Sequence, residues 1–227
     1  MSRKILLLLG GWLLITSSHA SMILDRTILT FSPGEPPRQD VSVKNPDNEN
    51  LYLEVSVLEV TDPGTENETR EVVKDPESIG LVAAPRLLMV PPGGSRTIRL
   101  VNLNGHADTE KVYRVNVTPA PPPTEAKGMA IRVLIAYQLL IFVEPTKPAE
   151  DLVAIRNGRI LKLHNKGNIN VLLTDGQQCQ SEDRNSCTEV QGKRLYPGNK
   201  LSLELPHDSG PVFFRVTSGG ENTLREF

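Results

Sequence analysis

Residues 130–143 read AIRVLIAYQLLIFV, and this stretch decides the fold. β-Branched and aromatic residues dominate it and neither end carries helix-capping residues, so a strand is favoured over a helix. Fourteen residues make a long strand, since strands usually have about 5–6. A strand this long and apolar is either enclosed in its own domain or held out to complete the sheet of another protein. Its side-chain period of two puts seven apolar residues on one face: Ile131, Val133, Ile135, Tyr137, Leu139, Ile141 and Val143.

The first twenty residues have the pattern of a secretory signal peptide. Two basic residues precede the apolar run Ile5–Ile15, and small residues lie at positions −3 and −1 of a cleavage site between Ala20 and Ser21. The apolar run is too short to span a membrane, which takes about 20 residues. We therefore expect that residues 1–20 are removed and that the mature protein is exported to the periplasm.

Size and charge restrict the classes to which the mature chain can belong. Removal of 20 of the 227 residues leaves 207, enough for one large β-domain or two of about 100 residues each. Loss of the two basic residues of the leader changes the formal charge from −2 to −4. Basic residues do not cluster with aromatic ones, so a nucleic-acid partner has no support.

Both cysteines, Cys179 and Cys187, lie in the exported part of the chain, within the segment CQSEDRNSC. An even number of cysteines in an oxidising compartment predicts one disulfide, here closing a short polar loop. A metal site would need further Cys or His residues at ligand spacing, and none lies nearby. We therefore expect a structural disulfide and no metal.

Short alternating segments separated by turn residues fill the rest of the chain. Residues 21–144 contain about seven of them, with Ile23–Phe31 as the first and the long strand as the last, which is typical of an immunoglobulin-like sandwich. After a short stiff linker at residues 145–148 the pattern restarts, and about five more segments lie in residues 149–227. The sequence therefore predicts an all-β protein with two β-sandwich domains.

Motifs of common enzymes and cofactor sites do not occur in the sequence. There is no Gly-x-Ser-x-Gly, no His-Glu-x-x-His and no phosphate-binding glycine loop. The mature histidines, His106, His164 and His207, are widely spaced, each beside turn residues or at a strand end. The single Trp lies in the leader, which disfavours a carbohydrate-active site. We expect no catalysis, no cofactor and no small-molecule substrate.

A set of short motifs runs in order through the mature chain: LDRTILTF at 24–31, VSVKN at 41–45, LYL at 51–53, PPGGSRTIRL at 91–100, VYRVN at 112–116, LHNKGNINV at 163–171 and LYPG at 195–198. Their order and spacing resemble those of periplasmic pilus chaperones of the chaperone–usher pathway. The second half, with its two cysteines, resembles the alternate branch that serves colonisation-factor-type fimbriae. The match extends over essentially the whole mature chain.

This resemblance implies two immunoglobulin-like domains in a boomerang arrangement. It also implies a chaperone that binds, folds and caps pilus subunits and delivers them to an outer-membrane usher. In the family, the long strand fills the groove of an incomplete subunit by donor-strand complementation. By position relative to the following proline, the donor residues are Ile131, Val133, Ile135 and Tyr137. Burying three aliphatic side chains contributes about 5–9 kcal/mol before ordering costs, at ~1.5–3 kcal/mol each.

The resemblance also implies a cation in the cleft between the domains, which holds the C-terminal carboxylate of the subunit. Arg26, in the motif LDRT, matches the first-strand arginine of the family. The family has a lysine on the long strand five residues before the proline, but Leu140 occupies that position here. Arg114 is the nearest substitute, because it is out of phase with the core-facing Tyr113 and Val115. Arg26 and Arg114 are the expected anchors.

The alternative is a fimbrial or surface β-sandwich subunit. Such subunits usually begin with an alternating extension that is donated to the neighbouring molecule, and end with an aromatic motif. Here Ser21-Met22-Ile23 leads directly into the first strand with no such extension. The sequence therefore favours the chaperone over the subunit.

Overall fold

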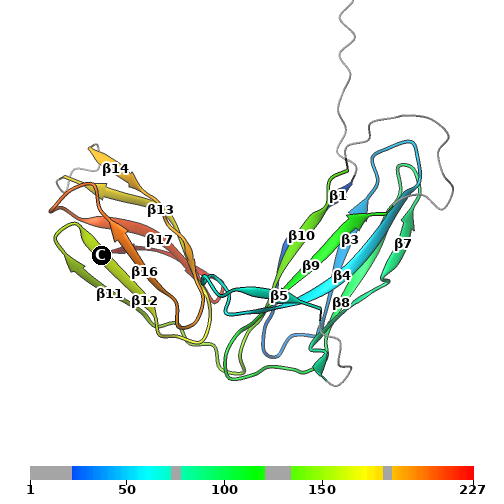
Figure 1. The fold of residues 1–227 in the computed structure, drawn as a ribbon, viewed down its shortest axis with the longest axis horizontal. Coiled ribbons are helices and arrows are strands. Elements are labelled where there is room, and N and C mark those ends of the chain that lie inside the picture. The colour runs from blue at the N-terminus through cyan, green and yellow to red at the C-terminus, as the bar shows by residue number, and fades with distance from the viewer. Residues whose placement is uncertain (1–21, 73–77, 121–133, 181–185) are drawn as a thin grey trace, which may run out of the picture.

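The computed structural model describes residues 22–72, 78–120, 134–180 and 186–227, which form eighteen β-strands. Two β-sandwiches form the arms of a V and meet at its base (Figure 1). The expected all-β fold, with two immunoglobulin-like domains in a boomerang arrangement, is confirmed. No helix of the described residues is long and apolar enough to cross a membrane. The expected signal peptide, residues 1–20, lies outside them.

The N-terminal arm consists of two sheets packed face to face. One sheet has the strand order β1-β3-β8-β6, and the other has the order β2-β10-β9-β4-β5, with β7 also paired to β4. The strands are β1 (Ile23–Leu24), β2 (Ile28–Phe31), β3 (Arg38–Lys44), β4 (Leu51–Thr61), β5 (Thr69–Glu71), β6 (Leu81–Ala84), β7 (Leu87–Val90), β8 (Ser95–Asn102), β9 (Lys111–Pro119) and β10 (Tyr137–Val143).

The first strand is divided between the two sheets. The sequence predicts one strand over Ile23–Phe31, but β1 pairs with β3 whereas β2 pairs in parallel with β10. At the crossing, the N–H of Asp25 donates to the Ser42 carbonyl at 3.2 Å, and the Asp25 Oδ1 accepts from the Ser42 N–H at 2.9 Å. Two residues later, the Thr27 carbonyl accepts from the Leu140 N–H at 2.8 Å in the other sheet. These bonds satisfy the backbone on both sides of the crossing.

The long strand is shorter than the sequence predicts. β10 covers Tyr137–Val143, and the described residues immediately before it are not in a strand. Antiparallel register pairs the first residue of β10 with Val117, so Ile135 would lie opposite Pro119. Proline has no N–H to donate, and the sequence after it contains three more prolines, so the ladder ends there.

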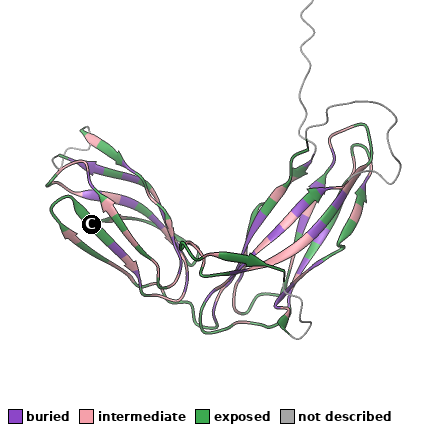
Figure 2. Ribbon diagram, viewed as in Figure 1, coloured by how far each residue is buried: buried purple, intermediate pink, exposed green. Residues whose placement is uncertain are grey.

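Buried and exposed residues alternate along the strands, which places a core between the two sheets of each arm (Figure 2). β10 contributes Leu139, Ile141 and Val143 to the core of the N-terminal arm, at 1%, 0% and 2% exposure. The odd face of the long strand therefore fills its own domain from Leu139 onward. Full burial of each such side chain stabilises the fold by about 1.5–3 kcal/mol.

The C-terminal arm repeats this architecture with a smaller core. One sheet has the order β11-β12-β16, and the other has the order β14-β13-β17-β18, with β15 also paired to β13. No described sheet contains strands from both sides of residues 145–148. The strands are β11 (Leu152–Asn157), β12 (Ile160–Asn165), β13 (Val171–Cys179), β14 (Cys187–Val190), β15 (Arg194–Leu195), β16 (Lys200–Glu204), β17 (Val212–Ser218) and β18 (Glu221–Glu226).

Cys179 and Cys187 form the expected disulfide, with Cα atoms 4.0 Å apart. They are directly opposite each other where β13 ends and β14 begins, so the bond closes the loop between these strands. Cys179 is fully buried. The bond therefore ties the end of β13 to the start of β14 at the edge of the C-terminal core.

Reduction of this disulfide is expected to lower the free energy of unfolding by about 2–3 kcal/mol, because the unfolded chain regains the entropy of an open loop. Urea unfolding of oxidised and reduced wild-type protein measures the difference without the cavity that an alanine variant would leave. An unchanged midpoint would contradict the prediction, and so would two titratable thiols in the unfolded, unreduced protein.

Candidate functional site

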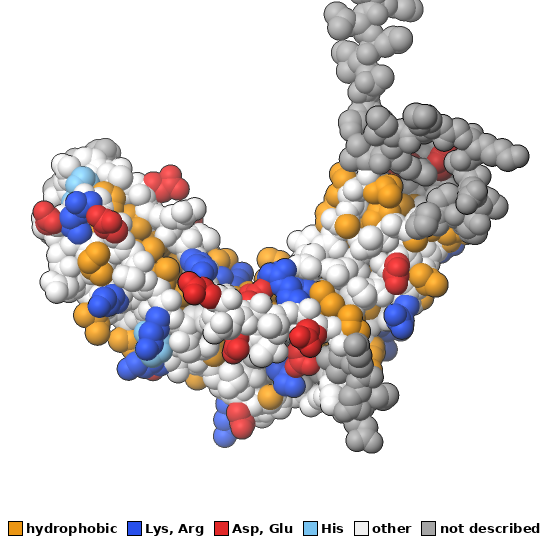
Figure 3. Space-filling view, viewed as in Figure 1, with side chains coloured by type: hydrophobic (Ala, Val, Ile, Leu, Met, Phe, Trp, Pro, Cys, Tyr) orange, Lys and Arg blue, Asp and Glu red, His pale blue; other side chains and the backbone are white. Residues whose placement is uncertain are grey.

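One face of the sheet β2-β10-β9-β4 is turned toward the C-terminal arm. The register places Leu140 beside Ile28 on one side and beside Arg114 on the other, so these three side chains share this face. We name this face, together with the residues of the C-terminal arm that pack on it, the interdomain cleft. Figure 3 shows basic and acidic side chains gathered at the floor of the gap between the arms.

An apolar cluster joins the two arms at the cleft. Val60, Val112, Leu140 and Phe142 of the N-terminal arm pack with Tyr196 of the C-terminal arm, and all five are buried. The rings of Phe142 and Tyr196 are tilted, with centroids 6.4 Å apart. The even positions of β10 therefore bind the second domain, while its odd positions fill the first.

Arg194, on β15, adds a cation from the C-terminal arm. Its guanidinium carbon lies 5.0 Å from the centroid of the Phe142 ring, and its Nη1 donates to the Oδ1 of Asn170. Burial lowers the pKa of Arg194, and the positive charge of Arg114 acts in the same direction. Two guanidinium groups from different domains therefore repel each other across the cleft.

A charged pair from the β4–β5 hairpin lies on the same face. The Arg70 Nε donates to the Glu68 Oε1 at 2.7 Å, and the Arg70 Nη1 donates to the Gln138 Oε1 at 3.0 Å. Because β4 and β9 lie between β5 and β10 in the sheet, the bond to Gln138 crosses above β9, the strand that carries Arg114. Burial opposes ionisation of Glu68. Hydrogen bonds from Gly64 and Arg70 and the charges of Arg70 and Arg114 outweigh it and hold the pKa of Glu68 below its usual range.

Arg114 lies among these charged groups, and one of its hydrogen-bond donors has no partner among the described residues. Its Nε is buried and has no hydrogen-bond partner among the described residues. A buried donor on a charged group normally has a partner, because leaving it unpaired costs about 1–3 kcal/mol. The unpaired donor makes Arg114 the residue of the cleft that is best placed to receive an anion.

Arg26, the other expected anchor, lies in the crossing between β1 and β2. Its side chain is 51% exposed, and its Nε pairs with the neighbouring Asp25 at 3.3 Å. The charge of Arg114 acts on Glu68 and Arg194, whereas the ion pair of Arg26 is with Asp25.

The expected donor residues lie at the start of β10 and before it. Ile131 and Val133 fall outside the described residues. Ile135 is 41% exposed, and its neighbour Leu134 is 51% exposed. Tyr137 packs partly against the core, with its hydroxyl 3.4 Å from the Met22 carbonyl. Of the donor row, Ile135 is therefore the described residue with apolar surface left over after its own domain has folded.

Glu110 is the most perturbed carboxyl group at the base of the V. It is 8% exposed, its Oε2 accepts from Asn170 at 2.7 Å, and its Oε1 has no partner among the described residues. Its backbone N–H donates to the Asn168 carbonyl at 2.9 Å, which adds a second bond between the arms. Burial raises the pKa of Glu110 from 4.5 to about 7.

The raised pKa of Glu110 predicts a loss of stability as the pH rises from 4.5 to about 7. In that interval the unfolded chain releases a proton that the folded protein keeps, so the free energy of unfolding falls, by on the order of 3 kcal/mol. Glu110→Gln keeps the acceptor for Asn170 and is expected to remove this pH dependence and to stabilise the protein at pH 7. Urea unfolding at pH 4.5 and 7.5 measures it. Parallel pH profiles of wild type and variant would contradict the prediction.

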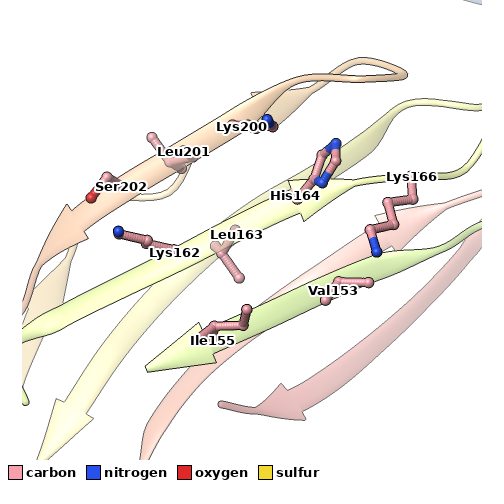
Figure 4. Close-up of a pocket in the computed structure, with 9 residues that line it drawn as sticks. All are labelled: Val153, Ile155, Lys162, Leu163, His164, Lys166, Lys200, Leu201 and Ser202. Atoms are coloured by element: carbon pink, nitrogen blue, oxygen red, sulfur yellow. The ribbon is translucent and has the colours of Figure 1, made fainter. Parts of the chain in front are cut away.

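A separate hollow of about 430 Å³ lies on the outer face of β11, β12 and β16 (Figure 4). Val153 and Ile155 form its apolar side, and Lys162, His164 and Lys200 lie along it. Ile155 is 65% exposed. The hollow shares none of its residues with the interdomain cleft, so it belongs to a different surface of the molecule.

Four charged residues of the interface were not predicted from the sequence: Glu68, Arg70, Glu110 and Arg194. Glu68 and Arg70 belong to a charged stretch that is typical of an exposed loop. A spacing of two on a strand does place both side chains on one face, which is the only signal for this pair. Arg194 immediately precedes the LYPG motif, but nothing in the sequence tells that it stacks on Phe142 of the other domain.

Two docked immunoglobulin-like sandwiches with a cationic cleft between them have the architecture of a chaperone of pilus assembly. The chain belongs to the family of pili and flagellar-assembly chaperones, because residues 21–149, more than half of its length, match the PapD N-terminal domain of that family. The resemblance found in the sequence motifs is thereby confirmed.

The chain is also similar in sequence to curated relatives and in fold to solved structures. The chain is 29% identical to a CS1 fimbrial subunit of Escherichia coli over 161 residues, 66% of this chain and 67% of that protein. It is 25% identical to a CFA/I fimbrial subunit of Escherichia coli over 190 residues, 79% of each chain. The class 5 fimbriae chaperone CfaA superposes with a TM-score of 0.68 at 22% identity, covering 90% of this chain and 98% of CfaA. A chain of the Salmonella enterica SafA pilin–SafB chaperone complex superposes with a TM-score of 0.66 at 18% identity, covering 93% and 98%.

Proposed function

We propose that the protein is a periplasmic chaperone that binds, folds and caps pilus subunits by donor-strand complementation and delivers them to an outer-membrane usher. Export follows from the leader at residues 1–20. The working parts are then a donor domain at residues 21–144 and a second domain at residues 149–227, joined by the linker 145–148. Neither a cofactor nor a catalytic step is needed, because the free energy comes from strand pairing and apolar burial.

The observation that carries this proposal is the difference in burial between β10 and the residues just before it. Leu139, Ile141 and Val143 are buried in their own core, while Ile135, in the same phase, is 41% exposed. An apolar row that continues past the edge of its own core is suited to a groove on another protein. The proposed donors are Ile131, Val133, Ile135 and Tyr137.

The cleft supplies the second part of the mechanism. A subunit's C-terminal carboxylate bound to Arg114 fixes the register of the added strand through charge-assisted hydrogen bonds. A slip of one residue would turn the apolar row away from the groove, so the cation and the donor row act together. Arg26 remains the second proposed anchor, supported by its place in the motif LDRT.

The alternative function, a structural fimbrial subunit, is favoured by the names of the two curated relatives, both of which are called fimbrial subunits. Against it stands the match of residues 21–149 to a chaperone family. The two functions differ in where the protein ends up. A chaperone stays in the periplasm and releases its cargo to the usher, whereas a structural subunit is built into the surface fibre.

Purification of a C-terminally tagged protein from periplasmic extract, in the host that carries its fimbrial genes, tests the proposal. We expect a stoichiometric complex with a fimbrial subunit, identified by mass spectrometry. Sheared surface fibres from the same cells serve as the control fraction and are expected to lack the protein. Its presence in the fibres, without a periplasmic complex, would establish the alternative.

A further inference from the structure

We propose that Glu68 is an internal stand-in for the subunit's C-terminal carboxylate, and that the two compete for one cationic site formed by Arg70 and Arg114. The inference rests on the proposed function, because it takes the competing anion to be the C-terminus of a pilus subunit. It concerns a residue of the β4–β5 hairpin, outside the donor strand and outside the LDRT motif.

The position of Glu68 is that of a bound anion. Its carboxylate accepts from two directions, from the Arg70 Nε at 2.7 Å and from the Gly64 backbone N–H at 2.7 Å. A guanidinium and a main-chain amide are the donors that hold carboxylate ligands in proteins. The Glu68 side chain is 17% exposed, so this is an enclosed contact and not a solvated surface pair.

Glu68 fills the site incompletely. No hydrogen bond joins it to Arg114, and the Arg114 Nε remains without a partner among the described residues. A carboxylate that arrives on a separate chain is not restricted by the hairpin, and it can satisfy this buried donor when Glu68 leaves the site. The external anion therefore has one interaction that the internal one lacks, which gives it the advantage in the exchange.

The hairpin that carries Glu68 is held by both arms. The Gly64 carbonyl lies 3.4 Å from the Lys193 Nζ of the C-terminal arm. A Cβ added to Gly64 would lie 2.8 Å from side-chain atoms of Tyr196 and Asn199, so the hairpin tip fits closely against that arm. The hairpin is thus fixed in place, and exchange requires only that the Glu68 side chain rotate away from Arg70.

A stand-in of this kind lowers the apparent affinity for the external anion by the fraction of molecules in which the site is free. An internal pair that closes the site in most molecules reduces that affinity by about three- to tenfold. In return, the cations are neutralised in the empty chaperone, and an anion of poor fit does not remain bound.

Titration of the mature protein with acetate, and with acetamide as the uncharged counterpart, tests the inference. The Nε–Hε signals of the arginines in a ¹⁵N NMR spectrum report binding. Glu68→Gln keeps the acceptor for Gly64 but removes the charge, and we expect acetate to bind about three- to tenfold more tightly. Glu71→Gln, the matched control, removes a charge from strand β5, which begins just after Glu68, and is expected to bind acetate as wild type does. Arg114→Ala is expected to abolish binding, and acetamide is expected to bind none of these proteins.

Equal acetate affinity in Glu68→Gln and wild type would overturn the inference, and so would weaker binding, which would make Glu68 a residue that positions Arg70. Tighter acetate binding in Glu71→Gln as well would mean that the loss of any negative charge nearby produces the effect, which would also overturn the inference. The acetate titration needs no pilus protein, so it tests the inference independently of the proposed function. The proposed function would fail alone if acetate binds as predicted but the protein captures no subunit in cells.

Discussion

Replacing Arg114 by alanine is expected to abolish the capture of a pilus subunit while the chaperone stays folded. The variant removes the cation whose Nε is buried and unpaired in the described structure, so the fold loses little. Charge-assisted hydrogen bonds contribute about 1.5–3 kcal/mol each, which predicts a complex weakened about ten- to a hundredfold per bond lost. Arg114→Lys is expected to rescue poorly, because a point charge cannot reproduce the fork of the guanidinium.

The yield of periplasmic complex and the melting temperature of each purified variant are the measurements. Arg99→Ala is the matched control, since Arg99 is an arginine of the same domain that pairs with Asp40 at 2.8 Å and whose side chain is 51% exposed. It is expected to give the wild-type yield. Wild-type yield from Arg114→Ala would remove the anchor from the mechanism.

The same experiment tests Arg26. Its motif predicts that Arg26→Ala destroys activity, whereas its described contacts are limited to Asp25. If both variants fail, the subunit's carboxylate draws Arg26 into the cleft on binding. If only Arg114→Ala fails, the anchor lies on β9 and the motif arginine serves the sheet crossing.

The sequence predicted the strands well where alternation is strong, because the side-chain period of two follows from backbone geometry alone. Lys111–Thr118 in the motif region and Tyr137–Val143 alternate clearly, and both are strands of the sheet that faces the cleft. The choice of Arg114 also came from alternation, since it is out of phase with Tyr113, and the register then placed it beside Leu140.

Features that depend on pairing between distant segments were not predictable in this way. The division of Ile23–Phe31 between two sheets depends on Asp25 bonding to Ser42, seventeen residues away. The position at which β10 begins depends on Pro119 in the opposite strand. Local pattern carries no information on which strand lies opposite, so the expected strand was too long and the first strand was not divided.

The charged residues of the interdomain cleft could not be predicted from local sequence for the same reason. Arg194, Glu68 and Arg114 come from three separate segments. Strand pairing within the N-terminal arm brings Glu68 near Arg114, and the docking of the arms adds Arg194. A sequence gives the sign of each charge but not its neighbours. The raised pKa of Glu110 is likewise a result of burial at the base of the V.

Truncation of the donor row, with Ile131→Ala, Val133→Ala and Ile135→Ala together, is expected to abolish subunit capture. The variant loses the burial of three aliphatic side chains in the subunit's groove, at ~1.5–3 kcal/mol each. This lowers the binding free energy by about 5–9 kcal/mol, enough to prevent a stable complex. The melting temperature is expected to change little, because β10 supplies its own core through Leu139, Ile141 and Val143.

Two neighbouring residues provide a matched pair for this prediction. Ile135 and Leu134 are 41% and 51% exposed, but they lie in opposite phases of the chain. If the segment adds a strand to the sheet of its partner, only one phase enters the groove. Ile135→Ala is then expected to weaken the complex about ten- to a hundredfold and Leu134→Ala very little, as measured by competition between tagged variants for one subunit pool. Equal losses from both would mean that the segment binds as general apolar surface. A normal yield from the triple variant would mean that capture does not use this row.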